Sequence, residues 1–419
     1  MSQNSIRTLF VTRYQAYPPV GGSPLRNWQN INIMMKFGLV AILSICFEKP
    51  SSNLDLPPGV TICKNYYIDE LRKQRSVWKK IKHRLWKLRT YGHPWHDRFD
   101  SDIVAQELSH ILAEFQPNIV VFEELWLYHY FNIAKRHGCA IIYDAHNAET
   151  SVAREISNLE PNKISPLMLN KVESIERDFV PKADQIWVCS QEDNSLLQEL
   201  CQKPLPIHVV PNGIDVASYD SDRIENLPSP TKLEPTPWSI LFTASFQYEP
   251  NAAAAQILID QIYPRLRENF PNCRLMLVGI KPTRYMRQAA EQDPGILVTG
   301  KVPDVRPYLA AASVVVIPLL QGGGTRLKIL EAFASKRPVV STTKGAQGLK
   351  VRDGEHLLVK DKVEEIVAAV KQLWSEPSLA KKLTDSAYQL VQTEYSWTAS
   401  SQSVEQAVQK LLVTYQRRD

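Results

Sequence analysis

Long hydrophobic runs are missing from this 419-residue sequence. The longest uncharged apolar stretch covers residues 37–47, whereas a membrane-spanning helix needs about 20 consecutive apolar residues. That stretch is more typical of a buried strand. The apolar run near the N-terminus is too short for the core of a signal peptide. We therefore expect a cytoplasmic protein without a membrane-spanning segment.

Paired cysteines, a strong charge excess and a dinucleotide fingerprint are also missing. The six cysteines are scattered, with no C-x-x-C pair, so we expect neither disulfides nor a zinc site. Lys and Arg number 49 against 44 Asp and Glu, an excess too small to indicate a dedicated nucleic-acid binder. The absence of G-x-G-x-x-G argues against a dehydrogenase that uses this motif.

Short apolar runs rich in Val and Ile alternate with amphipathic segments along the chain. We expect strands at residues 8–12, 39–45, 60–63, 118–124, 140–146, 185–190 and 207–212, then at 239–245, 274–279, 296–300, 313–319 and 337–342. Runs that are apolar on both faces are typical of parallel strands covered by helices on both sides. Such strand–helix alternation predicts an α/β protein with doubly wound parallel sheets.

A polar, proline-rich stretch between the two series of runs predicts a linker. We expect an N-terminal Rossmann-like domain at residues 1–217, a linker at 218–236 and a C-terminal Rossmann-like domain at 237–396. A helix in residues 397–419 is expected to pack back on the first domain. Ligands of doubly wound sheets bind at the carboxyl ends of the strands, so two such domains would face a central cleft.

The strongest chemical signal is the segment 318–334, PLLQGGGTRLKILEAFA. A buried strand ends there in three glycines, and a helix is expected to begin near Thr325. Glycines let a backbone approach a ligand closely, and a helix N-terminus suits a phosphate. Arg326 and Lys328 are positive charges near the positive end of the helix dipole, so they do not stabilise the helix. They are better explained as partners of a diphosphate. Glu331 could accept both hydroxyls of a ribose. The alternative is a glycine-rich surface turn with a solvated Arg and Lys.

This segment and several others together resemble the family 4 glycosyltransferases of the group 1 type. The blocks that carry the resemblance are PPVGG (18–22), YDAHNAE (143–149), VVPNGID (209–215), SFQYEPN (245–251), TGKVPDVRPYL (299–309), GGGTRLKILEAFA (322–334) and RPVVSTTKGAQGL (337–349). No single block is decisive, but their order and spacing are specific. The resemblance implies the GT-B fold, in which two Rossmann-like doubly wound parallel-sheet domains face a central cleft.

The resemblance also implies roles for individual residues. His146 is expected beside the donor sugar and the acceptor; Asp144 and Glu149 flank it, and either could instead cap the following helix. Arg326 and Lys328, inferred from their charges and not from the resemblance, join His146 as the expected catalytic residues. The residues expected to bind the donor are Gly21, Gly22, Val302, Gly323, Gly324, Thr325 and Glu331. Among them, Glu331 would hold the ribose, and the backbone near Val302 would meet the base.

The sequence departs from the family pattern at two places. The first glutamate of the family's Glu-x7-Glu motif is replaced by Gly323, which puts recognition of the donor sugar in question. The loop at residues 244–251, where many members carry an Arg and a Lys, has no cation. Arg326 and Lys328 are the nearest candidates to neutralise the diphosphate instead, so the cations lost from one loop would be regained on a nearby helix.

The implied activity is retaining transfer of a sugar from a nucleoside-diphosphate sugar to a glycan or lipid-linked acceptor. Such an enzyme stabilises the leaving diphosphate with cations and helix amides, so neither a metal nor a cofactor is expected. The pathway would be synthesis of a cell-surface polysaccharide or glycolipid. Two alternatives stay open: a nucleotide-sugar 2-epimerase, which shares the architecture, and a non-catalytic nucleotide-sugar-binding partner, which Gly323 would suit.

Residues 71–91 form a basic segment with nine Lys and Arg and no acid. One helical stripe of this segment holds Trp78, Ile81, Leu85 and Leu88. The pattern suits a helix on an anionic membrane surface, which would place the protein peripherally at the inner face of the membrane. The alternative is a helix that packs on the sheet and exposes its basic side to water. A nucleic-acid partner is not expected.

Overall fold

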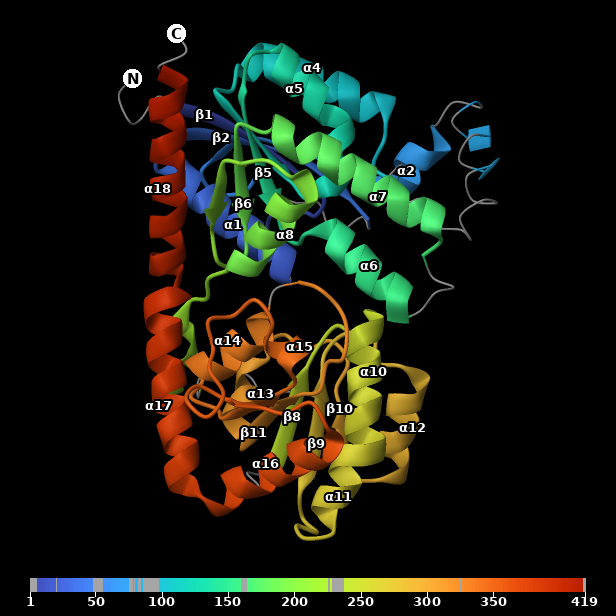
Figure 1. The fold of residues 1–419 in the computed structure, drawn as a ribbon, viewed down its shortest axis with the longest axis vertical. Helices are drawn as coiled ribbons and strands as arrows, with labels where there is room; N and C mark the ends of the chain where they lie inside the picture. The colour runs from blue at the N-terminus through green and yellow to red at the C-terminus, as the bar shows by residue number, and fades with distance from the viewer. Residues whose placement is uncertain are drawn as a thin grey trace. The chain divides into compact units, whose positions relative to one another are not determined.

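The computed structural model describes residues 6–19, 21–47, 56–74, 78, 80–81, 84–85, 98–159, 164–224, 227, 237–324 and 326–416. The chain forms two compact units. The N-terminal unit comprises Met1–Asn212, Gly323–Thr325 and Ser400–Asp419, and the C-terminal unit comprises Gly213–Gly322 and Arg326–Ala399. Each unit has its own parallel sheet (Figure 1), as predicted for the GT-B class.

The N-terminal unit contains a seven-stranded sheet in which all neighbouring strands are parallel. Its strands are β1 (Ile6–Thr12), β2 (Gly38–Cys46), β3 (Val60–Tyr67), β4 (Ile119–Glu123), β5 (Ala140–Ala145), β6 (Gln185–Val188) and β7 (Ile207–Val209). Their order across the sheet is β3-β2-β1-β4-β5-β6-β7. Helices cover both faces, so β4, β5 and β6 are buried at every position, which explains their continuous apolar sequences.

Helices of the N-terminal unit enclose two apolar cores, one on each face of the sheet. They are α1 (Gly22–Met35), α2 (Ile68–Lys73), α4 (Asp102–Phe115), η2 (Leu125–Tyr130), α5 (Phe131–Arg136), α6 (Glu149–Leu159), α7 (Pro166–Phe179), η3 (Val180–Lys182), α8 (Gln191–Cys201) and most of α18 (Trp397–Gln416). The expected C-terminal helix is α18, and its side chains Val404 and Val408 lie in one core with Ile31 of α1. Gln185 of β6 donates a hydrogen bond to the Ala407 carbonyl, 2.7 Å away.

The C-terminal unit contains a six-stranded parallel sheet in the order β10-β9-β8-β11-β12-β13. Its strands are β8 (Ser239–Thr243), β9 (Arg274–Val278), β10 (Ile296–Val298), β11 (Val314–Ile317), β12 (Val339–Ser341) and β13 (Leu358–Val359). Every strand expected from the sequence is present. The sequence does not predict β13, because two residues carry no periodicity and only their pairing with β12 makes them a strand.

Helices of the C-terminal unit surround a single apolar core. They are η4 (Val216–Tyr219), α9 (Ser221–Ile224), α10 (Glu249–Ile257), η5 (Leu258–Ile262), α11 (Tyr263–Arg267), α12 (Arg284–Gln292), α13 (Arg306–Ala311), α14 (Leu327–Ala334), α15 (Thr343–Ala346), α16 (Val363–Ser375) and α17 (Pro377–Glu394). The helices α10, η5 and α11 follow one another directly, and the middle one is a π-helical turn. Thr325, which precedes α14, lies outside the described residues.

Much of the basic segment, including Leu88, lies outside the described residues. Three side chains of its apolar stripe are described and are exposed: Trp78 at 82%, Ile81 at 45% and Leu85 at 55%. Within the described parts of the chain, no helix has the length and apolar character that crossing a membrane requires.

Candidate active site

The topology of each sheet indicates where a ligand would bind. Strand order reverses between β1 and β4 in the N-terminal unit, and between β8 and β11 in the C-terminal unit. In doubly wound sheets, ligands bind beyond the carboxyl ends of the strands at this switch point. The loops after β1, β4 and β5 carry one group of polar side chains, and the loop after β11 leads to a second group. Both groups contain residues that the sequence singles out.

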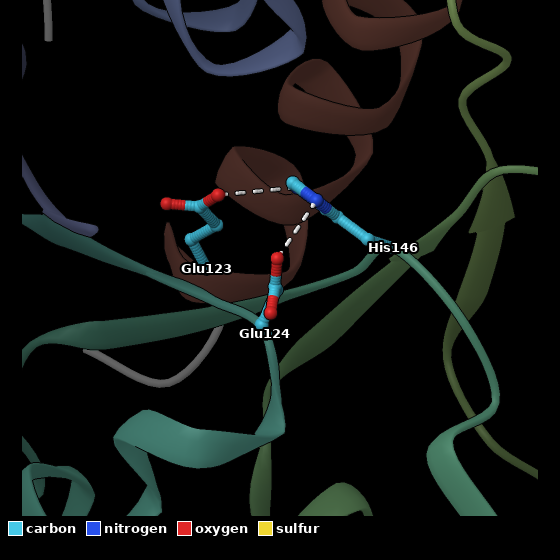
Figure 2. A group of neighbouring side chains, drawn as sticks. All are labelled: Glu123, Glu124 and His146. Carbon is cyan, nitrogen blue, oxygen red and sulfur yellow. Dashed lines mark ion pairs between the residues drawn. The ribbon is translucent and has the colours of Figure 1, made fainter. Parts of the chain in front are cut away.

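The first group centres on His146, which directly follows β5 and is 7% exposed. Glu123 ends β4, and Glu124 follows it. Figure 2 shows a carboxylate facing each ring nitrogen: Glu124 Oε1 lies 3.3 Å from Nδ1, and Glu123 Oε1 lies 3.7 Å from Nε2. Ser23 Oγ of α1 is also 3.2 Å from Nδ1. Parallel pairing of Glu123 with Asp144 in β5 brings these segments together.

Arg13, which directly follows β1, organises both carboxylates. Its backbone N–H donates to Glu123 Oε2 at 2.9 Å, and its guanidinium lies 2.7 Å from Glu124 Oε2. Glu124 has φ +62° and ψ 157°, a conformation that costs a residue with a side chain about 1–3 kcal/mol. The fold imposes this strain at the residue that connects the buried guanidinium to His146.

Asp144 has a different role from the helix cap that the sequence allows. Its carboxylate lies 2.6 Å from the Arg26 guanidinium and accepts a hydrogen bond from Asn30 at 3.0 Å. Arg26 also donates to the Val210 carbonyl at 2.7 Å and to Asn212 Oδ1 at 3.0 Å. This buried network ties α1 to β5 and to the segment after β7. Asp144 therefore holds the base of the His146 loop in place.

Burial and charge set the protonation of this group in opposite directions. Burial by itself lowers the pKa of His146, but the hydrogen bond that the ring donates to Glu124 and the charges of Glu123 and Glu124 outweigh it, so the pKa is raised. Burial raises the pKa of Glu123 to about 7. Burial would also raise the pKa of Glu124, but Arg13 holds it below its ordinary value. Burial and the neighbouring Glu124 raise the pKa of Glu149 to about 8.

The spacing of Glu123, Glu124 and His146 could also accommodate a metal ion, because one ligand atom from each lies within 4.8 Å of the others. The charges argue against that use. An ion at Glu124 would face the Arg13 guanidinium, and one near Asp144 would face Arg26. Glu124 already has a cationic partner in Arg13, so the group is better suited to hold protons than a metal.

The second group begins at the glycine loop after β11. Gly322 and Gly324 have φ +103° and +98°, in the region that favours glycine. Arg326 is the N-cap residue of α14, and its Nη2 donates to the carbonyls of Gly322 and Lys344, both at 2.9 Å. The sequence predicts this arginine as a ligand of the diphosphate. In the structure its guanidinium braces the loop that a phosphate would contact.

Lys328 lies in the first turn of α14, with its Nζ 3.0 Å from Asn251 Oδ1 and 4.3 Å from the centre of the Phe242 ring. Burial, followed by the charge of Arg326, lowers its pKa to about 7. The amine thus sits near the N-terminal turns of both α10 and α14. An anion placed there would favour its protonated form.

Glu331, on the next turn of α14, receives a hydrogen bond from the Tyr219 hydroxyl at 3.3 Å. Burial raises its pKa to about 7, against the opposing effects of Tyr219 and Lys328. A carboxylate held this way can accept hydroxyl groups, as the sequence predicts for a ribose.

The remaining predicted donor residues lie in loops. Gly21, with φ +91°, is the N-cap of α1, and a side chain there would meet nothing within 4 Å. Gly22 begins α1. Val302 lies between β10 and α13 and packs against the core of the C-terminal unit. Gly323 is half-buried in the loop after β11. The roles of these positions in donor binding stay predictions.

Sequence reasoning missed several residues of these groups, among them Arg13, Glu123, Glu124 and Tyr219. Glu123 and Glu124 were visible as paired acids at the end of an apolar run, which is a pattern that marks a strand's carboxyl edge. Arg13 ends the first run in the same way. Tyr219 follows the expected first domain and carries no local signal, because only the tertiary fold brings it to Glu331.

Comparison with known proteins identifies the class. Residues 68–218 match Glycosyltransferase Family 4, and residues 237–376 match Glycosyl transferases group 1. Among solved structures, sucrose-phosphate synthase from Thermosynechococcus elongatus superposes with a TM-score of 0.71 over 97% of this chain and 100% of its own, at 14% identity. WaaG, a glycosyltransferase involved in lipopolysaccharide biosynthesis, has a TM-score of 0.66 over 96% and 99% of the two chains, at 15% identity. At these identities the superpositions establish the fold.

The two sheets and these matches define a glycosyltransferase of the GT-B type. The family matches together cover more than half of the sequence, and the chain belongs to glycosyltransferase family 4, group 1 type. It is 33% identical over 104 residues to "Putative teichuronic acid biosynthesis glycosyltransferase TuaC" of Bacillus subtilis, spanning 24% of this chain and 26% of that protein. It is 24% identical over 245 residues to a glycogen synthase of Mycobacterium tuberculosis, spanning 56% of each.

Proposed function

We propose that the protein transfers a sugar from a nucleoside-diphosphate sugar to a hydroxyl of a glycan or lipid-linked acceptor. The observation that carries this proposal is the geometry of the second group. A glycine loop leads into α14, Lys328 lies near two helix N-termini, and Glu331 stands one turn further on. Helix amides and a cation suit a diphosphate, and a carboxylate suits a ribose.

The chemistry follows from the charge that develops on the leaving group. As the glycosidic bond breaks, the departing diphosphate gains negative charge while the sugar approaches an oxocarbenium ion. Lys328 and the amides of α14 would stabilise that diphosphate without a metal. His146 would orient the sugar or the acceptor hydroxyl. Retention of anomeric configuration would follow from front-face attack, which needs no carboxylate nucleophile.

The relatives support this donor class and an anabolic role. HepE of Anabaena, which superposes with a TM-score of 0.68 at 14% identity, has been crystallised with UDP and with UDP-glucose. TuaC and WaaG are named for teichuronic acid and lipopolysaccharide biosynthesis. We extend this to a role in cell-surface polysaccharide or glycolipid synthesis for the present protein.

The test is a panel of nucleotide sugars incubated with the protein and analysed by mass spectrometry. Slow release of free sugar from one donor would support transfer, because water can replace the acceptor. Interconversion of two donors would indicate an epimerase, and binding without turnover would indicate a non-catalytic nucleotide-sugar-binding partner. Either result would overturn the proposal.

Two variants separate the active site from the rest of the protein. His146→Gln should lower turnover about 100-fold, because the sugar or the acceptor hydroxyl would lose the group that orients it. His110→Gln is the matched control, because His110 is an exposed histidine on α4 that pairs with Glu114. Equal turnover in the two variants would show that His146 takes no part in the reaction.

We further propose peripheral contact with an anionic membrane through residues 71–91. Three apolar side chains of this segment, Trp78, Ile81 and Leu85, are exposed, and cations flank them in the sequence. Vesicles of phosphatidylcholine with and without phosphatidylglycerol test the idea at low salt. We expect binding to the anionic vesicles only, with loss of binding in Trp78→Ser. No binding to anionic vesicles would refute it.

A further inference from the structure

Glu124 connects a buried cation to the ring of His146. One carboxylate oxygen lies 2.7 Å from the Arg13 guanidinium, and the other lies 3.3 Å from His146 Nδ1. Glu124 is 4% exposed, so water competes little for either contact. A carboxylate in this position can accept a hydrogen bond from Nδ1–H. It can remain ionised at the same time, because the Arg13 guanidinium stabilises its negative charge.

Aromatic rings fix the arginine at the far end of this chain of contacts. The Arg13 guanidinium lies 5.1 Å from the centre of the Tyr14 ring, 5.7 Å from that of Phe47 and 5.4 Å from that of Phe99. Cations favour such positions near aromatic rings. The guanidinium therefore has a defined place, and it fixes the place of the Glu124 carboxylate.

The backbone of Glu124 is an independent sign of a functional constraint. Its φ of +62° with ψ of 157° is a conformation that glycine adopts and other residues avoid. Its N–H donates to the Asp144 carbonyl at 2.9 Å, which holds the strained peptide against β5. Strain of this kind persists where the surrounding structure directs a side chain to a particular target.

We infer that Glu124, anchored by Arg13, is a positioning residue that keeps a proton on Nδ1 of His146 and so assigns Nε2 to the chemistry of the site. This inference rests on the proposed function for His146. Nε2 and Glu123 Oε1 face each other across 3.7 Å, and neither has a hydrogen-bond partner among the described residues. One further proton is exchanged between them: its transfer from Nε2 leaves a neutral imidazole with Nδ1–H and a neutral Glu123 carboxyl.

The charged groups around the ring are consistent with this assignment. Asp144 Oδ2 lies 3.8 Å from Nε2, but its charge is balanced by Arg26. Glu149 lies near Glu124, whose charge helps to raise the pKa of Glu149. Among the described residues, Glu123 forms an ion pair with His146 and with no Lys or Arg side chain. Ser23, the other neighbour of Nδ1, is neutral and cannot hold a proton there as a carboxylate does.

The test reads the ring directly and needs no substrate. Protein labelled with ¹⁵N-histidine is titrated by NMR, and the His146 signals are assigned by their loss in His146→Gln. We expect Nδ1 to stay protonated in the neutral ring. Glu124→Gln should lower the pKa of His146 by about 1–3 pH units, as expected for loss of an adjacent opposite charge. Ser23→Ala should leave that pKa nearly unchanged.

Several outcomes would overturn the inference. One is an unchanged titration in Glu124→Gln, and another is a shift of similar size in Ser23→Ala. A third is a titration of the wild-type ring that changes on addition of EDTA or of stoichiometric Zn²⁺, which would indicate a metal site. Glu124→Gln leaves Arg13 as an unpaired buried cation, which could prevent folding. In that case the double variant Arg13→Met/Glu124→Gln removes the cation, and the pKa of His146 should fall by the same amount.

Kinetics then separate this inference from the proposed function. If a donor is turned over, Glu124→Gln should lower kcat with little change in the KM for the donor. The alkaline limb of the kcat–pH profile should move to lower pH by as much as the pKa of His146 measured by NMR. An NMR shift without any turnover in wild-type protein would contradict the proposed function and leave the positioning role of Glu124 intact. Turnover that is unaffected in Glu124→Gln would contradict the positioning role.

Discussion

Arg26 and Asp144 form an ion pair of 2.6 Å in which the side chains are 3% and 2% exposed. The pair joins α1, which begins at the loop of Gly21 and Gly22, to β5, which His146 directly follows. Arg26 also reaches the segment after β7 through Val210 and Asn212. Three separate parts of the chain around the His146 group thus depend on one guanidinium.

Arg26→Met should lower the free energy of unfolding of the N-terminal unit by about 3–5 kcal/mol, because it leaves a buried carboxylate without its partner. Urea unfolding followed by circular dichroism measures the loss. Arg26→Met combined with Asp144→Leu should recover much of it. Arg154→Met is the control, since its ion pair with Glu173 is exposed and is worth at most about 1 kcal/mol. Similar losses in the two single variants would contradict the prediction.

Lys328 should make stability depend on pH in a defined window. Its pKa falls from 10.5 to about 7 in the folded protein because of burial. Between these values the unfolded lysine binds a proton that the folded one does not, so its contribution to the free energy of unfolding rises with pH. Lys328→Met should remove this contribution. We expect its Tm to rise relative to wild type at pH 7, with the difference shrinking toward pH 10.

The exposed Lys371, which donates a hydrogen bond to Asn269, provides the control. Lys371→Met should follow the wild-type pH dependence. A Lys328→Met variant whose Tm tracks that of wild type over the whole window would show that Lys328 is not the source. The same variant should bind the donor more weakly, because it loses the cation near the helix N-termini.

Arg326 is predicted to act on the nucleotide through the loop that it braces. Arg326→Ala should raise the Kd for the nucleoside diphosphate about 10- to 100-fold, as for loss of charged hydrogen bonds worth ~1.5–3 kcal/mol, and should slow transfer severely. Arg326→Lys should behave similarly, because an ammonium does not reproduce the guanidinium contacts with Gly322 and Lys344. Calorimetric titration measures both. Near-normal binding and turnover in Arg326→Ala would refute the role.

Glu331 should distinguish a ribose from a deoxyribose. Its pKa is raised to about 7 by burial, so the ionised form that accepts hydroxyls increases from pH 6 to pH 8. Affinity for a nucleoside diphosphate relative to its 2′-deoxy form should therefore rise over this range. Glu331→Gln should remove the pH dependence of that ratio. Tyr219→Phe keeps the carboxylate and should therefore retain the pH dependence. If wild type and Glu331→Gln have equal affinity ratios at all pH values, Glu331 does not recognise the ribose.

The glycine loop of the C-terminal unit could be predicted because its signal is local. Gly322, Gly324, Lys328 and Glu331 lie close together in the sequence, and a strand followed by a helix places them at one edge of the sheet. Even here the bracing role of Arg326 could not be predicted, since one of its partners, Lys344, belongs to a later segment. The contacts of Lys328 with Phe242 and Asn251 could not be predicted either, because these residues come from other elements.

The His146 group shows the opposite case. His146 could be singled out by its motif, whereas Glu124 and Arg13 could not be linked to it. Glu124 directly follows β4 and Arg13 directly follows β1, and which strands become neighbours of β5 depends on the strand order of the whole sheet. The left-handed backbone of Glu124 is likewise imposed from outside, because no local preference of a glutamate favours it.

The sequence by itself determined the strands, the α/β class, the division into two sheets and the glycine loop, because these depend on side-chain polarity and on spacing along one segment. Only the tertiary structure decided which charges meet. Parallel pairing of β4 with β5 puts Glu123 beside Asp144, and burial then sets which groups keep a proton. Those effects act through space, so the order of residues in the chain does not record them.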